Sequence, residues 1–275
     1  YKITDNFKSF PINLGTFNNQ IPIIQLNIDK NEFILDEKAT YYFIQNDKND
    51  KNIKFTFRDS EAKLFLQGDF ENVNFEFKTE YKNYFKSSGE IRYDKNLLTG
   101  CVNFFYSTFE KVSLKSSDMI CEDSINIKNS SGSIEKIEIN NSLFDGLDLD
   151  FSDILIKNLF VNNAKNDCID FSFGNYIISK ANLKNCGDKG VSVGEKSKFN
   201  LQNAKIFNSK VGVASKDDAV TKINTILMED INICLAAYNK KKEFKGSKIS
   251  VKNFNCKRYK IKQQADDLSK IQILN

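Results

Sequence analysis

The strongest constraint in this chain is a repeat of 22 residues that runs without a gap through six registers. One column changes from acidic to basic to apolar and contains Asp123, Asp145, Asp167, Lys189, Val211 and Ile233. The next column contains only small residues: Ser124, Gly146, Cys168, Gly190, Gly212 and Cys234. The third contains only aliphatic residues: Ile125, Leu147, Ile169, Val191, Val213 and Leu235. A chain with this pattern returns to the same position once in every coil.

Short alternating apolar runs at this period predict an all-β fold, a right-handed parallel β-helix. The aliphatic column is expected to form a buried ladder, because inward side chains of successive coils stack about 4.8 Å apart. The small column suits a tight corner in which a larger side chain would clash. Asn recurs at the ends of the intervening strands, which favours left-handed turns and side-chain ladders.

Upstream of the repeat, the segments 53–57, 62–70, 73–77 and 101–107 also alternate as strands do, but at looser spacing. We therefore expect two parts. Residues 1–90 form a β-rich N-terminal cap or early coils, and residues 91–275 form the regular β-helix.

The composition excludes several classes of catalytic and binding site. The chain has 275 residues, no histidine and a net charge of +4. Histidine-dependent triads and His-ligated zinc are excluded, so acid–base chemistry must come from Asp, Glu, Lys, Tyr or Cys. The small positive surplus predicts no nucleic-acid partner. No apolar run is long enough for a membrane span.

The six cysteines permit two interpretations. An even number allows three disulfides in an oxidising compartment. We favour free, buried thiols, because several cysteines occupy apolar repeat positions. The chain begins at Tyr1 rather than Met, and we expect a secreted or cell-surface protein whose signal peptide is not part of this chain.

Four phrases on successive coils resemble the pectate lyase and polygalacturonase group, over about a quarter of the chain. They are LFDG (143–146), NDC (166–168), DKG (188–190) and ASK (214–216). The resemblance implies a parallel β-helix that acts on polysaccharide. In the family the second phrase begins with an aspartate that protonates the leaving oxygen, and here that position is Asn166, which cannot do so. Lys189 replaces the family's His and Ala214 its Arg, so direct polygalacturonase activity is not expected.

One stripe of polar residues follows the corners of successive coils and is the candidate site. We expect catalytic roles for Asp145, Asp167, Lys189 and Lys216, and substrate-binding roles for Asp148, Asp170, Asp188, Ser192, Glu195 and Tyr238. Asp145, Asp167 and Asp170 are candidate ligands for Ca²⁺, the only cofactor we expect, because hard cations prefer oxygen. A lysine in a partly desolvated cleft can have its pKa lowered and act as a base.

Three functional hypotheses follow. The first is a lyase or epimerase that acts on a uronate-containing polysaccharide. The second is a glycan-binding or cell-surface module without turnover. In the third, the corner Asp and Asn residues only satisfy backbone N–H groups and the charged face is only solvated. A trimer that buries one side should show an outer apolar stripe, and none is evident. The sequence does not specify an oligomeric state.

Overall fold

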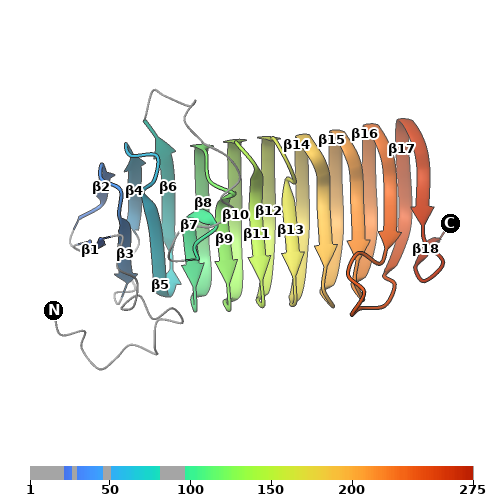
Figure 1. The fold of residues 1–275 in the computed structure, drawn as a ribbon, viewed down its shortest axis with the longest axis horizontal. Helices are drawn as coiled ribbons and strands as arrows, with labels where there is room; N and C mark the ends of the chain where they lie inside the picture. The colour runs from blue at the N-terminus through green and yellow to red at the C-terminus, as the bar shows by residue number, and fades with distance from the viewer. Residues whose placement is uncertain (1–21, 27–29, 46–50, 81–96, 275) are drawn as a thin grey trace.

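The computed structural model describes residues 22–26, 30–45, 51–80 and 97–274 as strands and turns of one parallel β-helix (Figure 1). The strands are β1 (Ile23–Gln25), β2 (Glu32–Leu35), β3 (Thr40–Gln45), β4 (Lys51–Phe57), β5 (Lys63–Glu71), β6 (Val73–Thr79), β7 (Gly100–Phe105), β8 (Thr108–Met119), β9 (Asp123–Lys128), β10 (Ser131–Ser142), β11 (Asp145–Asp150), β12 (Asp153–Ala164), β13 (Ile169–Ser172), β14 (Asn175–Gly194), β15 (Lys198–Lys216), β16 (Val220–Tyr238), β17 (Lys248–Ala265) and β18 (Lys270–Ile273). The expected all-β fold is confirmed. Among the described residues, no helix has the length and apolar character that a membrane crossing needs.

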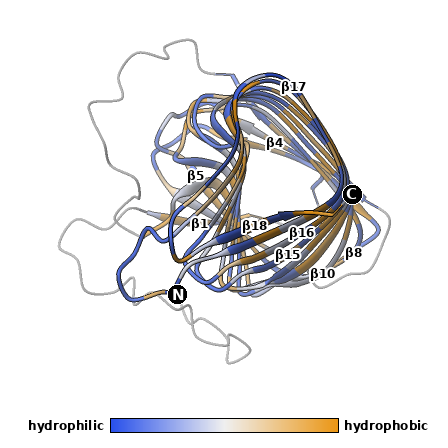
Figure 2. Ribbon diagram, turned by 90° about the vertical axis from the view of Figure 1, so that its right-hand side faces the viewer, coloured by the Kyte–Doolittle hydropathy of each residue, from blue (hydrophilic) through white to orange (hydrophobic). Residues whose placement is uncertain are grey.

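Each regular coil has three faces around an apolar interior, and Figure 2 shows this outline down the axis. The first face contains the start of β10, β12 and β14, and the second face contains their continuation. The third face contains β7, β9, β11, β13 and the last residues of β14, β15 and β16. Among the described residues the strand pairs are parallel, and each strand of the regular coils is paired with its equivalent in the next coil.

The predicted aliphatic ladder exists. The registers join Ile125 to Leu147, Leu147 to Ile169 and Ile169 to Val191, and they continue in the same column. Val191, Val213 and Leu235 complete it. Every member of this column has 0% exposure. This stack is the inner surface of the third face, so it fixes which side chains of the same strands point outward.

The small column lies at a tight corner, as predicted. A Cβ on Gly190 would lie 2.7 Å from the carbonyl oxygen of Gly212 and 2.7 Å from Cγ2 of Ile206. A Cβ on Gly212 would lie 2.2 Å from the sulfur of Met228 and 2.7 Å from the carbonyl oxygen of Cys234. Both contacts are shorter than real Cβ contacts, so these corners exclude any side chain unless the neighbours move.

A second corner confirms the prediction for asparagine. Asn141, Asn163, Asn185 and Asn208 all have positive φ, between 55° and 67°. Asn tolerates this left-handed region better than other non-glycine residues. The Nδ2 of Asn163 donates to Oδ1 of Asn141 at 2.9 Å, and the Nδ2 of Asn208 donates to Oδ1 of Asn185 at the same distance. The turn and the side-chain ladder therefore use the same residues.

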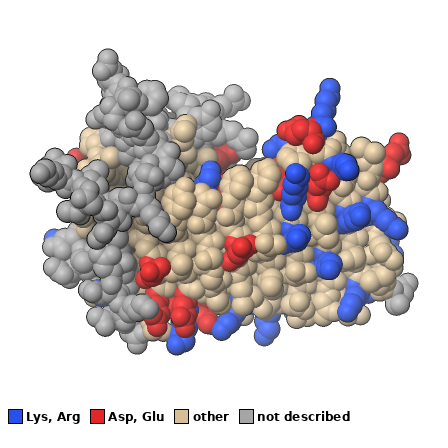
Figure 3. Space-filling model, turned by 90° about the horizontal axis from the view of Figure 1, so that it is seen from below, with Lys and Arg blue, Asp and Glu red and all other residues tan. Residues whose placement is uncertain are grey.

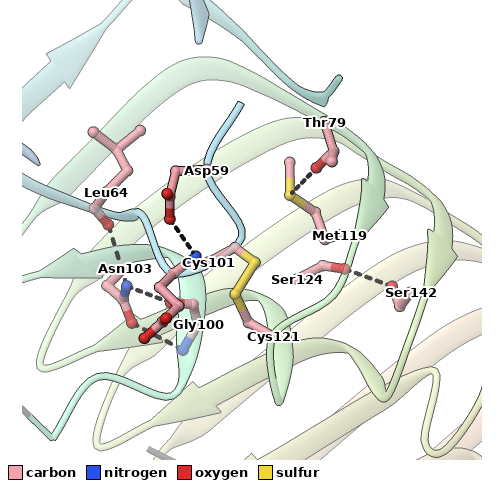
Figure 4. The surroundings of a disulfide bond; sticks show 11 residues. Asp59, Leu64, Thr79, Gly100, Cys101, Asn103, Met119, Cys121, Ser124 and Ser142 are labelled. Atoms are coloured by element: carbon pink, nitrogen blue, oxygen red, sulfur yellow. Dashed lines mark hydrogen bonds between the residues drawn. A yellow bond between two sulfur atoms is a disulfide. The ribbon is translucent and has the colours of Figure 1, made fainter. Parts of the chain in front are cut away.

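The expectation of free thiols is wrong. The structure contains the disulfides Cys101–Cys121, Cys168–Cys186 and Cys234–Cys256. Each joins neighbouring coils, and Figure 4 shows the first of them beside the Ser124–Ser142 pair. Ser124 and Ser142, whose hydroxyl oxygens lie 2.5 Å apart, are separated by 18 residues, as are Cys168 and Cys186. The serine pair and the disulfide therefore occupy equivalent places in different coils.

The cysteines follow the small column. The strand register places Cys101 opposite Ser124, so Cys101 extends the small column by one coil. Cys101, Cys168 and Cys234 each form one disulfide, and two coils without a cysteine in this column separate each from the next. A disulfide therefore occurs once in every three coils, and the small column also serves for covalent cross-linking.

The N-terminal strands belong to the same ladder. β1 pairs with β3, β3 with β5 and β5 with β7, all in parallel. Residues 22–80, where they are described, are therefore early coils. Their interior is filled by phenylalanines such as Phe55 and Phe77, whose rings stack at 5.6 Å. The expected boundary near residue 90 lies outside the described residues.

Candidate functional site

The outer surface of the third face is the place where the structure puts the predicted site residues. Asp148 pairs in register with Asp170, and Asp170 pairs with Ser192. Glu195 follows directly after β14, and Tyr238 ends β16. The corner residues Asp145, Asp167, Asp188 and Lys189 border this face on one side. The chain thus brings the predicted residues onto one side of adjacent coils.

The corner carboxylates connect each coil to the next. Oδ1 of Asp145 accepts from the backbone N–H of Asp167 at 2.7 Å and from Nδ2 of Asn166 at 2.7 Å. Oδ1 of Asp167 accepts from the backbone N–H of Lys189 at 2.9 Å. Asp145 and Asp167 are only 6% and 3% exposed. They therefore satisfy backbone donors in the way that the structural interpretation predicts, and they offer little surface to a ligand.

Lys189 is held between two acids. Its Nζ lies 3.3 Å from Oδ1 of Asp167 and also forms an ion pair with Asp188. Burial alone would lower the pKa of Lys189, but the charge of Asp167 and the hydrogen bond to Asp188 outweigh it and raise the pKa. A general base needs the opposite shift. The raised pKa does not favour Lys189 as a base, and the catalytic role expected for it stays a prediction.

Lys216 crosses the third face in the space that Gly194 leaves open. Its Cε would be 3.4 Å from a Cβ on Gly194, and its Nζ lies 3.6 Å from Oδ1 of Asp170. Burial alone would lower the pKa of Lys216, but the charges of Asp170 and Glu195 raise it. The raised pKa does not favour Lys216 as a base either, and its expected catalytic role stays a prediction.

The stripe is less open than the sequence predicts. Side chains on both sides of the ladder were expected to face solvent, yet Ser192 has 0% exposure and Lys216 has 6%. Asp148, Asp170, Asp188 and Tyr238 are half-buried. The reason is long-range: the Lys216 side chain lies along this face, and residues 239–247 approach it from a later coil.

Several carboxyl groups have raised pKa values because they are buried beside one another. Burial, reinforced by the charges of Asp167 and Asp123, raises the pKa of Asp145 to about 8. Burial raises that of Asp123 to about 7, and that of Asp148 lies well above its usual value. Burial raises the pKa of Asp167 to about 6, although Lys189 opposes the shift. Near neutral pH, this stack therefore carries protons that isolated aspartates would have lost.

Asp145, Asp167 and Asp170 are the candidate ligands for Ca²⁺. Among the described residues, no group of three or more acidic, Cys or His side chains is arranged to hold a metal ion. Oδ1 of both Asp145 and Asp167 already accepts from backbone N–H groups. These backbone hydrogen bonds compete with a metal ion for Oδ1 of both residues, and calcium binding here stays a prediction.

Residues 239–247 contain the basic run that continues the polar stripe in the sequence, where a solvated loop is the favoured interpretation. We call them the lysine loop, because they contain Lys240, Lys241, Lys242 and Lys245. Buried Asp217 accepts from the backbone N–H groups of Lys240 and Lys241 at 2.6 and 2.8 Å. The Nδ2 of Asn239 donates to the carbonyl oxygens of Lys241, Phe244 and Lys245. These interior bonds hold the loop in one conformation, whereas the KKK run alone suggests only a solvated loop.

The lysine loop reaches back toward earlier coils. Lys241 forms an ion pair with Glu195 at 2.5 Å, and Glu195 accepts from the hydroxyl of Ser172 at 2.6 Å. Burial would raise the pKa of Glu195, but Lys241 and Ser172 bring it below its usual value. The ring of Phe244 lies 6.1 Å from that of Phe173. Residues 239–247 lengthen this coil beyond the 22-residue period, which lets the loop reach these partners.

Two hollows lined by described residues lie away from the candidate residues. Ile226, Phe254 and Leu274 help to line one near the C-terminal end, and Asn52, Asn74 and Lys111 help to line the other. Neither contains a predicted site residue.

No protein-family model matches the sequence, and no curated protein matches it. The resemblance to the pectate lyase and polygalacturonase group thus stays a prediction. A solved structure, full-length tailspike protein 2 of the Escherichia coli O157:H7 bacteriophage CAB120, is similar with a TM-score of 0.55 and 9% identity. The match covers 92% of this chain and 38% of the tailspike chain. At this identity the likeness concerns the fold, which is a parallel β-helix shared with a bacteriophage tailspike.

Proposed function

We propose that this protein binds a polysaccharide along the outer surface of the third face and works outside the cell or at a cell surface. The observation that carries the proposal is the row of half-buried polar side chains on two adjacent coils. Asp148 and Asp150 lie on one coil, and Asp170 and Ser172 lie in register with them on the next. Coils about 4.8 Å apart present the same groups repeatedly, which suits a polymer with a repeating unit.

Two further observations support the proposed extracellular location. Disulfides form and persist mainly in oxidising compartments, and all six cysteines of this chain are paired. The similar solved structure is a tailspike protein, and by that name it belongs to the tail of a virus particle. Both favour an extracellular protein.

Binding without turnover is the form of the proposal that the geometry favours. Lys189 and Lys216 are each paired with acids that raise their pKa values, which disfavours either one as a base. Asp145 and Asp167 use carboxylate oxygens to connect coils. What stays accessible is a set of hydrogen-bonding groups, which is what recognition requires.

The experiment is a binding screen of the purified chain against immobilised neutral, carboxylated and sulfated polysaccharides. Asp170→Ala and Tyr238→Phe are expected to weaken binding to whichever glycan is retained, since both side chains lie half-buried on the third face. Lys157→Ala is the matched control, because it removes an exposed ion pair with Glu135 away from that face. Loss of binding in the control, or equal binding in all variants, contradicts the proposed location.

A second candidate function is a lyase or epimerase that acts on a uronate-containing glycan. One observation favours it: the pKa values of Asp145 and Asp167, about 8 and about 6, lie on either side of neutrality. Neighbouring acids whose pKa values differ in this way can divide the roles of acid and base. In the lyase or epimerase hypothesis the base is a carboxylate. Lys189 and Lys216 then contribute only positive charge.

Polygalacturonate and alginate are suitable substrates for the test. Formation of unsaturated uronates would be followed by absorbance, and epimerisation by exchange of the C5 proton for deuterium. If the parent protein is active, Asp167→Asn should lose most of the activity, because the amide cannot take up a proton. Activity within twofold of the parent in both Asp167→Asn and Asp145→Asn would exclude this pair.

A further inference from the structure

One corner of the β-helix contains aromatic residues where the backbone favours other residue types. This corner follows the third face, and its column contains Tyr106, Asn129, Phe151, Phe173, Glu195 and Asp217. Each of these six residues has positive φ, with values between 36° and 57°. Asn and Asp tolerate this region, but a bulky residue adopts it rarely and with strain. Two consecutive coils nevertheless have phenylalanine there.

Packing into the interior does not explain these phenylalanines. Phe151 is 49% exposed and Phe173 is half-buried. Their rings lie parallel, with centroids 4.7 Å apart and an interplanar angle of 5°. The ring of Phe244 from the lysine loop extends the row beyond Phe173. We call Phe151, Phe173 and Phe244 the aromatic ridge. Strain combined with exposure of apolar rings indicates a role other than folding.

Lysines lie at both ends of the aromatic ridge. The Nζ of Lys128 lies 5.8 Å from the centroid of Phe151, and the Nζ of Lys196 lies 5.8 Å from that of Phe244. The lysine loop adds four lysines and one glutamate, Glu243. Of its four lysines, Lys241 is engaged with Glu195. Figure 3 shows Lys and Arg side chains gathered over the C-terminal half of the side seen from below. The apolar ridge is therefore framed by ammonium groups.

We propose that the aromatic ridge and the lysines around it form a binding site for an acidic polysaccharide, with sugar rings packed on the phenylalanines and carboxylate or sulfate groups on the lysines. The apolar C–H surface of a pyranose ring packs on an aromatic ring, and ammonium groups attract its anionic substituents. The ridge runs from coil to coil, so an extended chain parallel to the axis meets it in successive units. The inference rests on the proposed function, because it names the class of glycan and a second contact surface beside the third face.

Asparagine substitutions separate binding from folding. Asn129 occupies the same column one coil before Phe151, so Phe151→Asn and Phe173→Asn give the backbone a residue that it accepts. The melting temperature of either variant should stay within a few degrees of the parent. Affinity for polygalacturonate or heparin should fall at least tenfold. Phe160→Ala is the matched control, because Phe160 is 39% exposed with Lys136 5.5 Å from its ring, but lies on another face.

A neutral polymer tests the charge requirement. Dextran should bind at least tenfold more weakly than polygalacturonate or heparin, and raising the salt concentration should weaken binding of the acidic polymers only. Lys196→Ala and Lys128→Ala should lower the affinity for acidic polymers without changing that for dextran.

The outcomes are distinguishable. If glycan binding persists unchanged in both asparagine variants, the ridge is not a binding site, while binding along the third face still stands. Equal affinity for dextran and for the acidic polymers overturns the charge requirement and with it this inference. If the parent protein binds none of the polymers, the proposed function and the inference both fail. If both asparagine variants lose affinity only in parallel with a large fall in melting temperature, the stack is structural and the proposal is wrong.

Discussion

Lys216 forms an ion pair with Asp170 two coils away, with Nζ 3.6 Å from Oδ1. The stem of the lysine passes Gly194 on the coil between them, where a Cβ would lie 3.4 Å from Cε of Lys216. It is thus an axial connection on the outside of the helix, parallel to the ladder inside.

A double-mutant cycle measures this pair. Lys216→Met keeps most of the apolar stem over Gly194 but removes the charge, and it should lower the free energy of unfolding by about 1–3 kcal/mol. Asp170→Asn should have a smaller effect, because this side chain is 27% exposed. Urea unfolding at neutral pH should show a coupling energy of about 1 kcal/mol between the two changes. Strictly additive effects would mean that the two charges do not interact.

The stacked aspartates make stability depend on pH. The pKa of Asp145 is about 8 in the folded protein, against about 3.9 in an unfolded chain. The folded state therefore binds more protons between these values, and the free energy of unfolding falls as pH rises through that range. Glu195 acts in the opposite direction, because its pKa is lowered, but only at more acidic pH. The stability that Asp145 contributes is complete below about pH 4.

Asp145→Asn isolates this effect. The amide keeps an oxygen that can accept from the N–H of Asp167 and never ionises. Urea midpoints measured from acidic to mildly alkaline pH should fall less steeply in the variant than in the parent. The variant should be the more stable of the two above about pH 8. Parallel curves for the two proteins would refute the raised pKa.

The disulfides predict a simple thiol count. In denaturant, the protein should show no reactive thiol before reduction and six after it, because every cysteine is paired. The double change Cys168→Ser with Cys186→Ser should cost about 3 kcal/mol, since it opens a short closed loop. The two hydroxyls can still bond to one another, as those of Ser124 and Ser142 do. Six thiols detected without reductant would contradict the pairing.

The asparagine corner separates backbone strain from side-chain bonding. Asn163 has φ 67° and donates to Asn141 at 2.9 Å. Asn163→Ala loses both the tolerance for this φ and the bond, whereas Asn163→Gly loses only the bond. We expect the glycine variant to be more stable than the alanine variant by about 1 kcal/mol, measured as thermal and urea stability. Asn203→Ala, at an exposed position without positive φ, is the control and should be close to neutral. Equal losses for Gly and Ala would show that the corner is unstrained.

The sequence predicts contacts between residues of one repeat column that lie one coil apart, and it misses contacts between residues of different columns. Ile169 contacts its equivalents one coil away, so a fixed period revealed both the ladder and the corner glycines. The partners of the column cysteines, such as Cys186, lie outside that column at separations of 20, 18 and 22 residues. The repeat alone therefore could not predict the disulfide partners, which depend on the three-dimensional shape of the corner. The burial of Ser192 and Lys216 depends on side chains from other coils, which no repeat encodes. Whether the pKa of Lys189 is raised or lowered could not be predicted without the positions of Asp167 and Asp188.

The spacing of the disulfides has a mechanical consequence. In a solenoid each coil contacts only its neighbours, so a pull on either terminus opens the molecule one coil at a time. Cys234–Cys256, Cys168–Cys186 and Cys101–Cys121 each hold two adjacent coils together against such peeling. Under tension the chain would extend in short bursts that stop at each sulfur bridge, and the length released by each burst would be set by the coils between successive bridges.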